Sequence, residues 1–477
     1  MTLPPPNVEL PEARVDERGE SVASDIDIER LKVKAEEIAG RETERLLERT
    51  PESAKLFQRA VKHLPMGVTS SFQVNDPYPI YGDHGKGSKF WDVDGNEYVD
   101  YHNGFGAMAV GHAHPKVVEA IERAARGGTH FATTTPTSVA FAEELCRRFK
   151  LDKVRFSNSG TESTMDAIRV GRAVTGKDAL IKIEASYHGH HDDVFYSVIP
   201  NFDSMGPPER PADAPFSRGI PKSGGQEIRV VPFNNAEALE KLLDAEADRI
   251  GAMIMEPIMM NVGLIPPLPG YLEKVRGLCS KYNVAMIFDE VKTGATIAEG
   301  GAIEYFGVQP DLACFAKSIG GGTPTAAFGG KAEFMDEIGK SLAHLGTFNG
   351  NPLCSAAGLA ALTEVLTPDQ YTCFKDLGAR LASGCEEVLN QYGIPSHVRD
   401  FGCKGAISYS AKPFENYRDF LQAEPELFYG NWPWMLNRGI FMTPGDEEQW
   451  TISAQHNESD IDKWVDAYAG YCEELVK

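Results

Sequence analysis

287-IFDEVKTG-294 and the lysine that ends 312-LACFAK-317 are the segments from which the rest of this chain can be interpreted. Each segment contains an apolar run of the kind that forms a buried strand, and each run ends at a charged residue. That residue is Asp289 in the first segment and Lys317 in the second. A charged group at the end of a buried strand is unfavourable unless it is paired or used in chemistry. The two segments therefore predict two buried strands whose ends carry either a structural ion pair or a functional site.

Further apolar runs alternate with helical patterns on both sides of these segments. We expect strands at 153–156, 179–184, 229–233, 251–257, 284–290, 312–317 and 326–330, with helices between several of them. Apolar strands without strict alternation, separated by helices, are typical of a largely parallel sheet that is buried on both faces. An earlier segment, 89-KFWDVDGNEYVDY-101, predicts a β-hairpin, because its Asp-Gly turn is flanked by aromatic and β-branched residues.

The remaining segments differ in character. Residues 1–24 are rich in proline and charge, which indicates a disordered or draped arm. Helical patterns run from Ile26 to about Glu48 and again to about Leu64; these helices could cover a partner subunit or the smaller lobe, or form a solvated surface pair. The stretch 201–226 holds five prolines and four glycines, which is typical of a lid or an insertion. Helix and strand patterns after Pro368 suffice for a smaller α+β lobe.

Composition excludes several classes of function. With 477 residues the chain should form two or more lobes, and its net charge of −22 argues against a nucleic-acid or anionic-membrane partner. No apolar run is long enough to span a membrane, and the N-terminal residues lack the apolar core of a secretory signal. The eight cysteines are scattered, with no CxxC pair, so we expect reduced thiols, no metal site and a cytoplasmic location.

Two loops that follow predicted strands have the residues of a ligand site. In 158-NSGTES-163, small residues and the first N–H groups of a helix could hold a phosphate, although Ser and Thr are also ordinary N-caps. In 186-SYHGHHD-192, Tyr187 could stack on a planar ligand or belong to the core. The histidines of this segment lack the spacing of a metal site, so none is expected.

Asp289 and Lys317 together suggest a particular chemistry. A lysine in an apolar pocket has a lowered pKa and can form a Schiff base. Such a lysine often serves pyridoxal phosphate, whose pyridine nitrogen needs an acidic partner. The alternative is a salt bridge at the edge of the sheet.

With these pieces the chain resembles the fold-type I, class III pyridoxal-phosphate aminotransferases and is most similar to the glutamate-1-semialdehyde 2,1-aminomutase group. The resemblance covers about residues 55–470. It rests on motifs that recur in order: 67-GVTSS-71, 111-GHAHP-115, NSGTES, 187-YHGHHD-192, 256-EPIMMNVGLIPP-267, 288-FDEVKTG-294, 316-AKSIGGG-322 and 346-GTFNGNP-352. It implies an α/β fold with a large, mainly parallel mixed-sheet domain and a smaller α+β domain from both chain ends.

The resemblance also implies roles for individual residues. Lys317 matches the lysine that forms the Schiff base, Asp289 the partner of the pyridine nitrogen, and Tyr187 the aromatic residue stacked on the ring. The resemblance further implies that Val291 packs against the ring and that Ser159, Gly160 and Thr161 hold the phosphate. Glu256 and Asn261 would lie near the ring substituents. Thr347 matches a threonine that reaches the phosphate of the neighbouring subunit, which implies a homodimer with shared sites. The stretch 201–226 falls where the aminomutases have a gating loop.

Two departures bear on the substrate. Where the aminomutases have an arginine that holds the substrate carboxylate, this chain has Gln73, and Phe105 stands at a tryptophan-type position. A neutral amide cannot make the bidentate charged pair that arginine makes. Another arginine, such as Arg399, could hold a carboxylate, or it could form a surface or structural ion pair.

We therefore expect an enzyme that moves an amino group between an amino donor and a keto or aldehyde acceptor through a Lys317 Schiff base. An intramolecular 2,1-aminomutase is the alternative, and a non-catalytic member of the family is a weaker one. For the domains we expect an N-terminal extension over 1–50, the first part of the small domain over 51–104, a large cofactor domain over 105–345, and a connecting helix with the rest of the small domain over 346–477.

Overall fold

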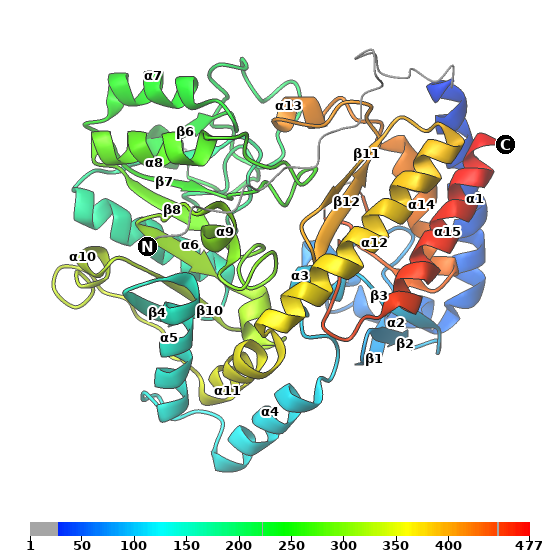
Figure 1. Ribbon diagram of the computed structural model, residues 1–477, viewed down its shortest axis with the longest axis horizontal. Coiled ribbons are helices and arrows are strands. Elements are labelled where there is room, and N and C mark those ends of the chain that lie inside the picture. The colour runs from blue at the N-terminus through cyan, green and yellow to red at the C-terminus, as the bar shows by residue number, and fades with distance from the viewer. Residues whose placement is uncertain (1–26, 222, 446–447) are drawn as a thin grey trace.

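The computed structural model describes residues 27–221, 223–445 and 448–477, so the arm expected over 1–24 lies outside the described residues. Figure 1 shows a larger lobe built around one sheet and a smaller lobe in which the two ends of the described chain meet. Two consecutive helices, α11 (Pro352–Ala360) and the long α12 (Pro368–Tyr392), lead from the larger lobe into the smaller one. How the chain divides into domains at residues 50, 104 and 345 remains a prediction.

The larger lobe contains a seven-stranded sheet with the order β4-β10-β9-β8-β7-β5-β6. Strands β5 to β9 run parallel, and β10 is antiparallel to both of its neighbours, so the predicted mainly parallel mixed sheet is confirmed. Its strands are β4 (Lys153–Ser157), β5 (Ala179–Ile183), β6 (Ile228–Val231), β7 (Ile250–Met255), β8 (Ala285–Asp289), β9 (Leu312–Phe315) and β10 (Ala326–Gly330).

Helices bury both faces of this sheet, which is why its strands are apolar without alternation. Helix α6 (Gly160–Thr175) contacts β7, β8, β9 and β10. At Gly171 of this helix a Cβ atom would lie 3.2 Å from Ala252 Cβ and 3.1 Å from Ala285 Cβ, so a small residue permits the close approach. The other helices of this lobe are α4 (Pro115–Gly127), α5 (Pro136–Phe149), α7 (Ala236–Glu246), α8 (Tyr271–Tyr282), α9 (Gly301–Phe306) and α10 (Ala332–Met335).

Two small sheets belong to the smaller lobe. The predicted hairpin is present as β2 (Lys89–Asp92) and β3 (Glu97–Asp100), in a sheet completed by β1 (Gly82–Lys86) and β13 (Ile440–Phe441). The second sheet consists of β11 (His397–Asp400), β12 (Lys404–Ser408) and β14 (Trp450–Thr451). The helices are α1 (Ile28–Arg49), α2 (Pro51–Ala60), α3 (Asn103–Gly106), α13 (Tyr417–Phe420), α14 (Glu426–Asn437) and α15 (Glu458–Val476).

Helix α1 packs along α14 and also contacts α15, so the first described helix covers the smaller lobe of its own chain. Leu31, Ala35 and Ile38 form its buried stripe, and Asp27 caps its N-terminus by accepting a hydrogen bond from the backbone N–H of Arg30. Of the placements left open for this helix, the structure supports the smaller lobe.

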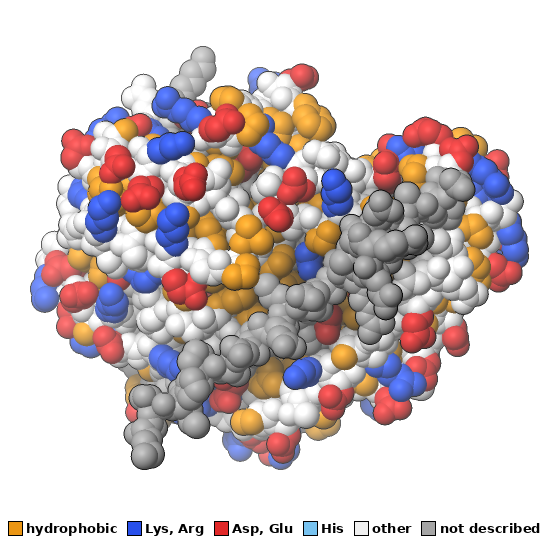
Figure 2. All heavy atoms as spheres, turned by 45° about the horizontal axis from the view of Figure 1, so that its top comes forward, with side chains coloured by type: hydrophobic (Ala, Val, Ile, Leu, Met, Phe, Trp, Pro, Cys, Tyr) orange, Lys and Arg blue, Asp and Glu red, His pale blue; other side chains and the backbone are white. Residues whose placement is uncertain are grey.

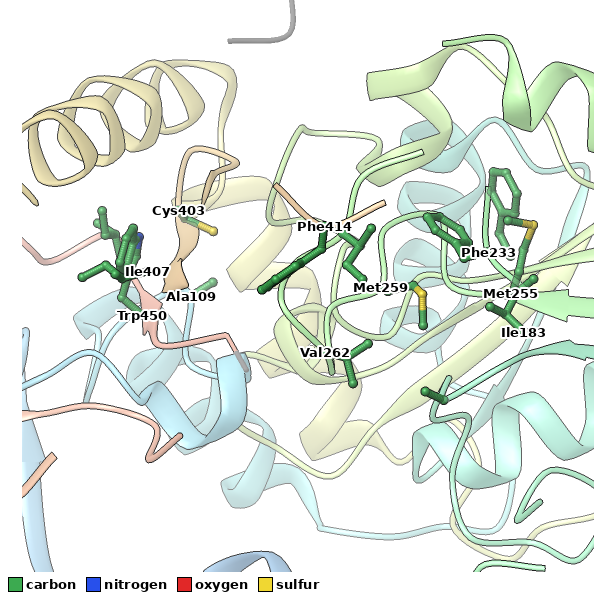
Figure 3. Packing of buried hydrophobic residues seen from close by; sticks show 14 of the residues in the cluster. Ala109, Ile183, Phe233, Met255, Met259, Val262, Cys403, Ile407, Phe414 and Trp450 are labelled. Atoms are coloured by element: carbon green, nitrogen blue, oxygen red, sulfur yellow. The ribbon is translucent and has the colours of Figure 1, made fainter. Parts of the chain in front are cut away.

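The hydrophobic core continues from one lobe to the other (Figure 3). Ile183 and Met255 belong to the sheet of the larger lobe and Phe233 to the turn after its strand β6, whereas Ile407 and Trp450 belong to the smaller lobe. Met259, Val262 and Phe414 lie between the two groups. The lobes are therefore joined by packed apolar side chains as well as by the chain.

The stretch 201–226, apart from Lys222, is largely irregular and ends in a short 3-10 helix, Gly224–Glu227. The smaller lobe holds it in place, because the guanidinium of Arg418 donates to the carbonyls of Met205 and Gly206 and forms an ion pair with Glu184. Figure 2 shows acidic and basic side chains interspersed on one face of the molecule. Within the described ranges no helix is long and apolar enough to cross a membrane.

Candidate active site

A cavity of about 340 Å³ lies where β8 and β9 end, at the carboxyl edge of the sheet. Open α/β sheets bind ligands at this edge. Ten of the residues singled out from the sequence line it: Phe105, Ser159, Gly160, Thr161, Tyr187, Glu256, Asn261, Asp289, Val291 and Lys317.

Lys317 follows β9 and begins a 3-10 helix, Lys317–Gly320. Its φ of 51° is in the left-handed region, where a residue with a side chain is strained, and such strain concentrates at functional sites. The hydroxyl of Ser318 donates to the carbonyl of Gly106 (2.9 Å) and ties this turn to the smaller lobe. Burial, together with the nearby ammonium of Lys292, lowers the pKa of the Lys317 amine to about 8. Near neutral pH part of this amine is therefore unprotonated.

Asp289, at the end of β8, is 5% exposed and receives two hydrogen bonds. The ring Nδ1 of His188 lies 2.7 Å from its Oδ2, and the backbone N–H of Val291 donates to its Oδ1 (3.0 Å). No ion pair joins Asp289 and Lys317 in the part of the chain that the structure describes. The two groups face one cavity as separate charges, as expected if both act on the same ligand.

Tyr187 lies in the loop after β5 and is held through its backbone, since its N–H donates to Glu256 Oε1 (3.1 Å). The other oxygen of Glu256 accepts from the backbone N–H of Met260 (3.0 Å) and from the side-chain amide of Asn261 (2.9 Å). Burial raises the pKa of Glu256. This carboxyl group thus connects the loops after β5 and β7 at the floor of the cavity.

Helix α6 directs its N-terminus at the cavity. Ser159 is the N-cap residue, and its hydroxyl accepts from the backbone N–H of Glu162 (3.2 Å). A Cβ atom at Gly160 would lie only 3.1 Å from a methyl group of Val291, so glycine leaves the helix end open. The first N–H groups of a 16-residue helix, at the positive end of its dipole, can hold a phosphate.

Three of the residues singled out from the sequence lie elsewhere. Gln73 turns its side chain back: its Oε1 accepts from the backbone N–H groups of Thr69 and Ser70 and from the Thr69 hydroxyl (2.6 Å). Arg399 is on β11, and burial lowers its pKa. Thr347 lines a different, open cavity together with Phe131. None of the three lines the cavity at Lys317.

The cavity also contains residues that sequence reasoning did not assign to it. Phe72 packs against Tyr187 and Phe105, with ring centroids 5.5 and 5.8 Å apart. His188 is the partner of Asp289, and Lys292 is a second lysine in the lining. Each follows or precedes a residue that was singled out, but adjacency in sequence does not say which way a loop side chain points. Among the described residues, no group of His, Cys, Asp and Glu is arranged to hold a metal ion.

The cavity fits pyridoxal phosphate by the chemistry of its lining. It provides an amine, a buried carboxylate, an aromatic ring and a helix N-terminus that a Cβ atom at Gly160 would obstruct. It also contains a buried polar atom, His188 Nε2, that has no hydrogen-bond partner among the described residues. A planar ligand with a phosphate and a pyridine nitrogen matches these groups.

Comparison with known proteins agrees with this geometry. The family model of the class-III aminotransferases matches residues 71–426, which is more than half of the chain. A glutamate-1-semialdehyde 2,1-aminomutase from Listeria welshimeri is 37% identical over 429 residues, covering 89% of this chain and 98% of that protein. The corresponding enzyme from Methanopyrus kandleri is 36% identical over 421 residues, covering 88% and 96%.

Solved structures of transaminases and aminomutases superpose on this chain. An omega-transaminase from Sphaerobacter thermophilus superposes with a TM-score of 0.84 at 34% identity and covers 89% of this chain and 97% of its own. A glutamate-1-semialdehyde aminomutase from Pseudomonas aeruginosa superposes with a TM-score of 0.85 at 28% identity, covering 94% and 99%. Both likenesses extend over nearly the whole fold.

Proposed function

The chain belongs to the class-III aminotransferase family, and from that premise we propose that it transfers an amino group between an amino donor and a keto or aldehyde acceptor, with Lys317 as its catalytic residue. It is a pyridoxal-phosphate enzyme, as the family and its structural neighbours indicate. The observation that carries the proposal is the placement of Lys317 and Asp289 on one cavity without an ion pair between them.

When bound, pyridoxal phosphate supplies an electron sink for the carbon that bears the amino group. Lys317 would hold the aldehyde carbon, Asp289 the pyridine nitrogen, and Tyr187 and Val291 the two faces of the ring. The phosphate would lie on Ser159, Gly160 and Thr161, with Glu256 and Asn261 near the ring substituents. These roles are supported by the positions of the residues around the cavity.

The amino substrate would release Lys317 Nζ from the aldehyde carbon, and the free amine would then remove the proton from the amino-bearing carbon of the substrate. A pKa of about 8 suits a base that works near neutral pH, because the amine is neither fully protonated nor too weak to accept a proton. Asp289 would keep a proton on the pyridine nitrogen, and His188, whose Nδ1 lies 2.7 Å from Oδ2, would fix the orientation of the carboxylate. The rings of Phe72, Phe105 and Tyr187 exclude water from one wall of the cavity.

A second candidate is the intramolecular 2,1-aminomutase, in which one molecule is both donor and acceptor. Relatives with that name are 35–38% identical to this chain over most of its length. The position of Gln73 favours the transaminase, since no arginine side chain lines the described cavity.

The proposal includes a homodimer in the cytoplasm, with Thr347 reaching the phosphate of the neighbouring subunit. Two observations support it. Large apolar side chains near Thr347 are exposed, with Leu345 88% and Phe348 57% accessible in the isolated chain. All eight cysteines are free thiols, as in a reducing compartment.

The test is a half-reaction. We expect that the cofactor-loaded protein, given an amine donor and no acceptor, loses its visible absorbance band and releases one equivalent of keto product per site. Lys317→Ala should slow this by several orders of magnitude, because the base is lost. Lys340→Ala, at a lysine that is 66% exposed, is the matched control and should behave as the wild type.

Two results would contradict the transaminase. Turnover of a single diamino or amino-aldehyde substrate without any acceptor would favour the aminomutase. A Lys317→Ala protein as fast as the wild type would exclude the catalytic role of this lysine.

A further inference from the structure

Lys182 is a buried lysine that the proposed mechanism does not use. It lies on β5, the strand that precedes the loop of Tyr187, and it is fully buried. Burial lowers the pKa of its amine to about 7, and the carboxyl group of Glu256 opposes the shift. A buried ammonium group is unfavourable unless protein groups replace the water around it, so its partners indicate the role of this lysine.

The ammonium group of Lys182 meets backbone carbonyls at the two ends of one loop. Its Nζ donates to the carbonyl of Ser186 (2.9 Å), where the chain leaves the strand. It also donates to the carbonyls of Tyr196 and, at 3.5 Å, of Ser197, where the chain returns. A protonated lysine has three N–H groups for these three acceptors, whereas a neutral amine has two. Lys182 therefore closes the loop that contains Tyr187.

The peptide group between Ser186 and Tyr187 is held on both sides. Its carbonyl accepts from Lys182, and its N–H donates to Glu256 Oε1 (3.1 Å). Lys182 belongs to β5, and Glu256 directly follows the neighbouring strand β7. The plane of this peptide group sets the direction in which the chain enters Tyr187. An amine and a carboxyl group from adjacent strands thus fix the residue whose ring lines the cavity.

The ends of this loop adopt backbone conformations that need such support. Ala185 has a φ of 65° and Ser197 a φ of 47°, both in the left-handed region, where a residue with a side chain is strained. The N–H of Ala185 donates to the carbonyl of Ser197 (2.9 Å), so the two ends meet. The N–H of Ser197 in turn donates to the carbonyl of Ala214, within the stretch 201–226. The loop that Lys182 closes therefore also anchors the base of that stretch.

We propose that Lys182 is a positioning residue whose ammonium group fixes the peptide group before Tyr187 and closes the loop that contains it. The fixed loop presents Tyr187 to the ring of the cofactor and His188 to Asp289, whose Oδ2 lies 2.7 Å from the histidine Nδ1. Lys182 is not part of the cavity lining, so it acts through the backbone. This inference rests on the proposed function, because it concerns the site of the same cofactor.

The experiment removes the ammonium group and measures the loop in the cofactor-free protein. Lys182→Met keeps an apolar side chain of similar length, and the measurements are made at pH 6.5, below the pKa of about 7. Hydrogen exchange is followed by mass spectrometry. We expect the amides of residues 185–197 to exchange about tenfold or more faster than in the wild type, because the loop loses a charged donor. Exchange in β7 should be unchanged.

A second measurement concerns the cofactor. The visible circular dichroism of the loaded protein, divided by its absorbance, reports how rigidly the protein holds the ring. We expect this ratio to fall in Lys182→Met, and the dissociation constant of pyridoxal phosphate to rise about tenfold, the effect of one hydrogen bond from a charged group.

Two further variants assign the effect to this ammonium group. Lys182→Gln removes the charge but keeps a polar side chain, and it should change the same amides and the same ratio. Lys177→Met is the matched control. Lys177 also donates to backbone carbonyls, those of Tyr282 (3.0 Å) and Asn283 (2.9 Å), but it precedes β5 at the opposite end of the strand. This control should behave as the wild type in both measurements.

Unchanged exchange over 185–197 in both Lys182→Met and Lys182→Gln would overturn the inference. Faster exchange of the loop without any change in the signals of the cofactor would overturn it as well. It would also be wrong if both variants failed to fold, because Lys182 would then be a structural group of the core and not one that positions a loop. The proposed function fails on different observations: no visible band in the wild type, or no release of keto product from any amine donor.

Discussion

At the scale of single residues, the reactive group is an amine whose surroundings disfavour its charge. Burial lowers the pKa of Lys317 to about 8, and Lys292 contributes in the same direction, whereas Asp289 and Glu448 oppose the shift. An amine is nucleophilic only in its neutral form, so the same environment that destabilises the ammonium makes Lys317 reactive.

The reactivity of Lys317 should therefore follow a low titration midpoint. In the cofactor-free protein, acylation by an amine-reactive reagent should rise with pH and reach half of its maximum rate near pH 8, because the neutral fraction grows as the pH passes the pKa. Lys281, whose pKa is raised by its hydrogen bonds to Tyr282 and Glu240, should reach its midpoint at a higher pH. Peptide mapping by mass spectrometry measures both sites in one sample. Equal midpoints for the two lysines would contradict the environment described.

At the scale of elements, the site depends on how closely the loop after β5 approaches the start of α6. Gly189 has a φ of 96°, and a Cβ atom there would lie 2.7 Å from the Cα of Thr161. The loop and the helix end thus touch through a residue without a side chain. Both Tyr187 and the phosphate cup depend on this contact for their positions.

Gly189→Ala should weaken pyridoxal-phosphate binding by about tenfold or more, because the added methyl group must displace Thr161 from the helix end. Gly219→Ala is a matched control: its φ is 100°, but no atom lies within 4 Å of a Cβ placed there. Both variants bear the strain of a positive φ, so the difference between them isolates the steric clash. Titration of the absorbance band with cofactor measures the affinity. Equal affinities in the two variants would show that the contact is not needed.

At the scale of the whole molecule, the exposed apolar side chains near Thr347 are the surface expected to bind a second copy. Leu345 is 88% exposed, Phe348 57% and Phe131 51% in the isolated chain. Exposed large apolar side chains that lie close together are typical of an interface, and Leu345 and Phe348 are three residues apart in the chain. In the proposed homodimer this face also supplies Thr347 to the site of its neighbour.

Leu345→Glu should shift the protein from dimer to monomer and reduce its retention of cofactor, because a carboxylate would be buried at the interface without a partner. Val33→Glu is the control: Val33 is 58% exposed, on α1 in the smaller lobe. Sedimentation velocity measures the assembly, and the visible band measures the cofactor. If Leu345→Glu sediments as the wild type does, then the interface lies elsewhere.

Local pattern was sufficient for the sheet and its helices, and it indicated Ser159, Thr161, Tyr187, Asp289 and Lys317 as candidates for a ligand site; the other candidates came from the resemblance. Apolar runs and helical periods predicted β4 to β10, because a strand that is buried on both faces consists mainly of apolar residues. Ten of the singled-out residues line one cavity; most of them follow strands whose carboxyl ends meet at one edge of the sheet, whereas Phe105 comes from α3 of the smaller lobe. The resemblance to the class-III aminotransferases supplied the family, which the comparisons confirm.

Only the tertiary structure decided the direction of side chains in loops and the meeting of distant segments. Gln73 turns back to Thr69 and Ser70 because its amide closes a local turn, a choice that residue type does not reveal. The contact of His188 with Asp289, and the sharing of Glu448 by Lys292 and Lys404, join residues far apart in the chain. The first contact depends on how two loops fold at one edge of the sheet and the second on how the two lobes pack, and no periodicity in the sequence predicts either.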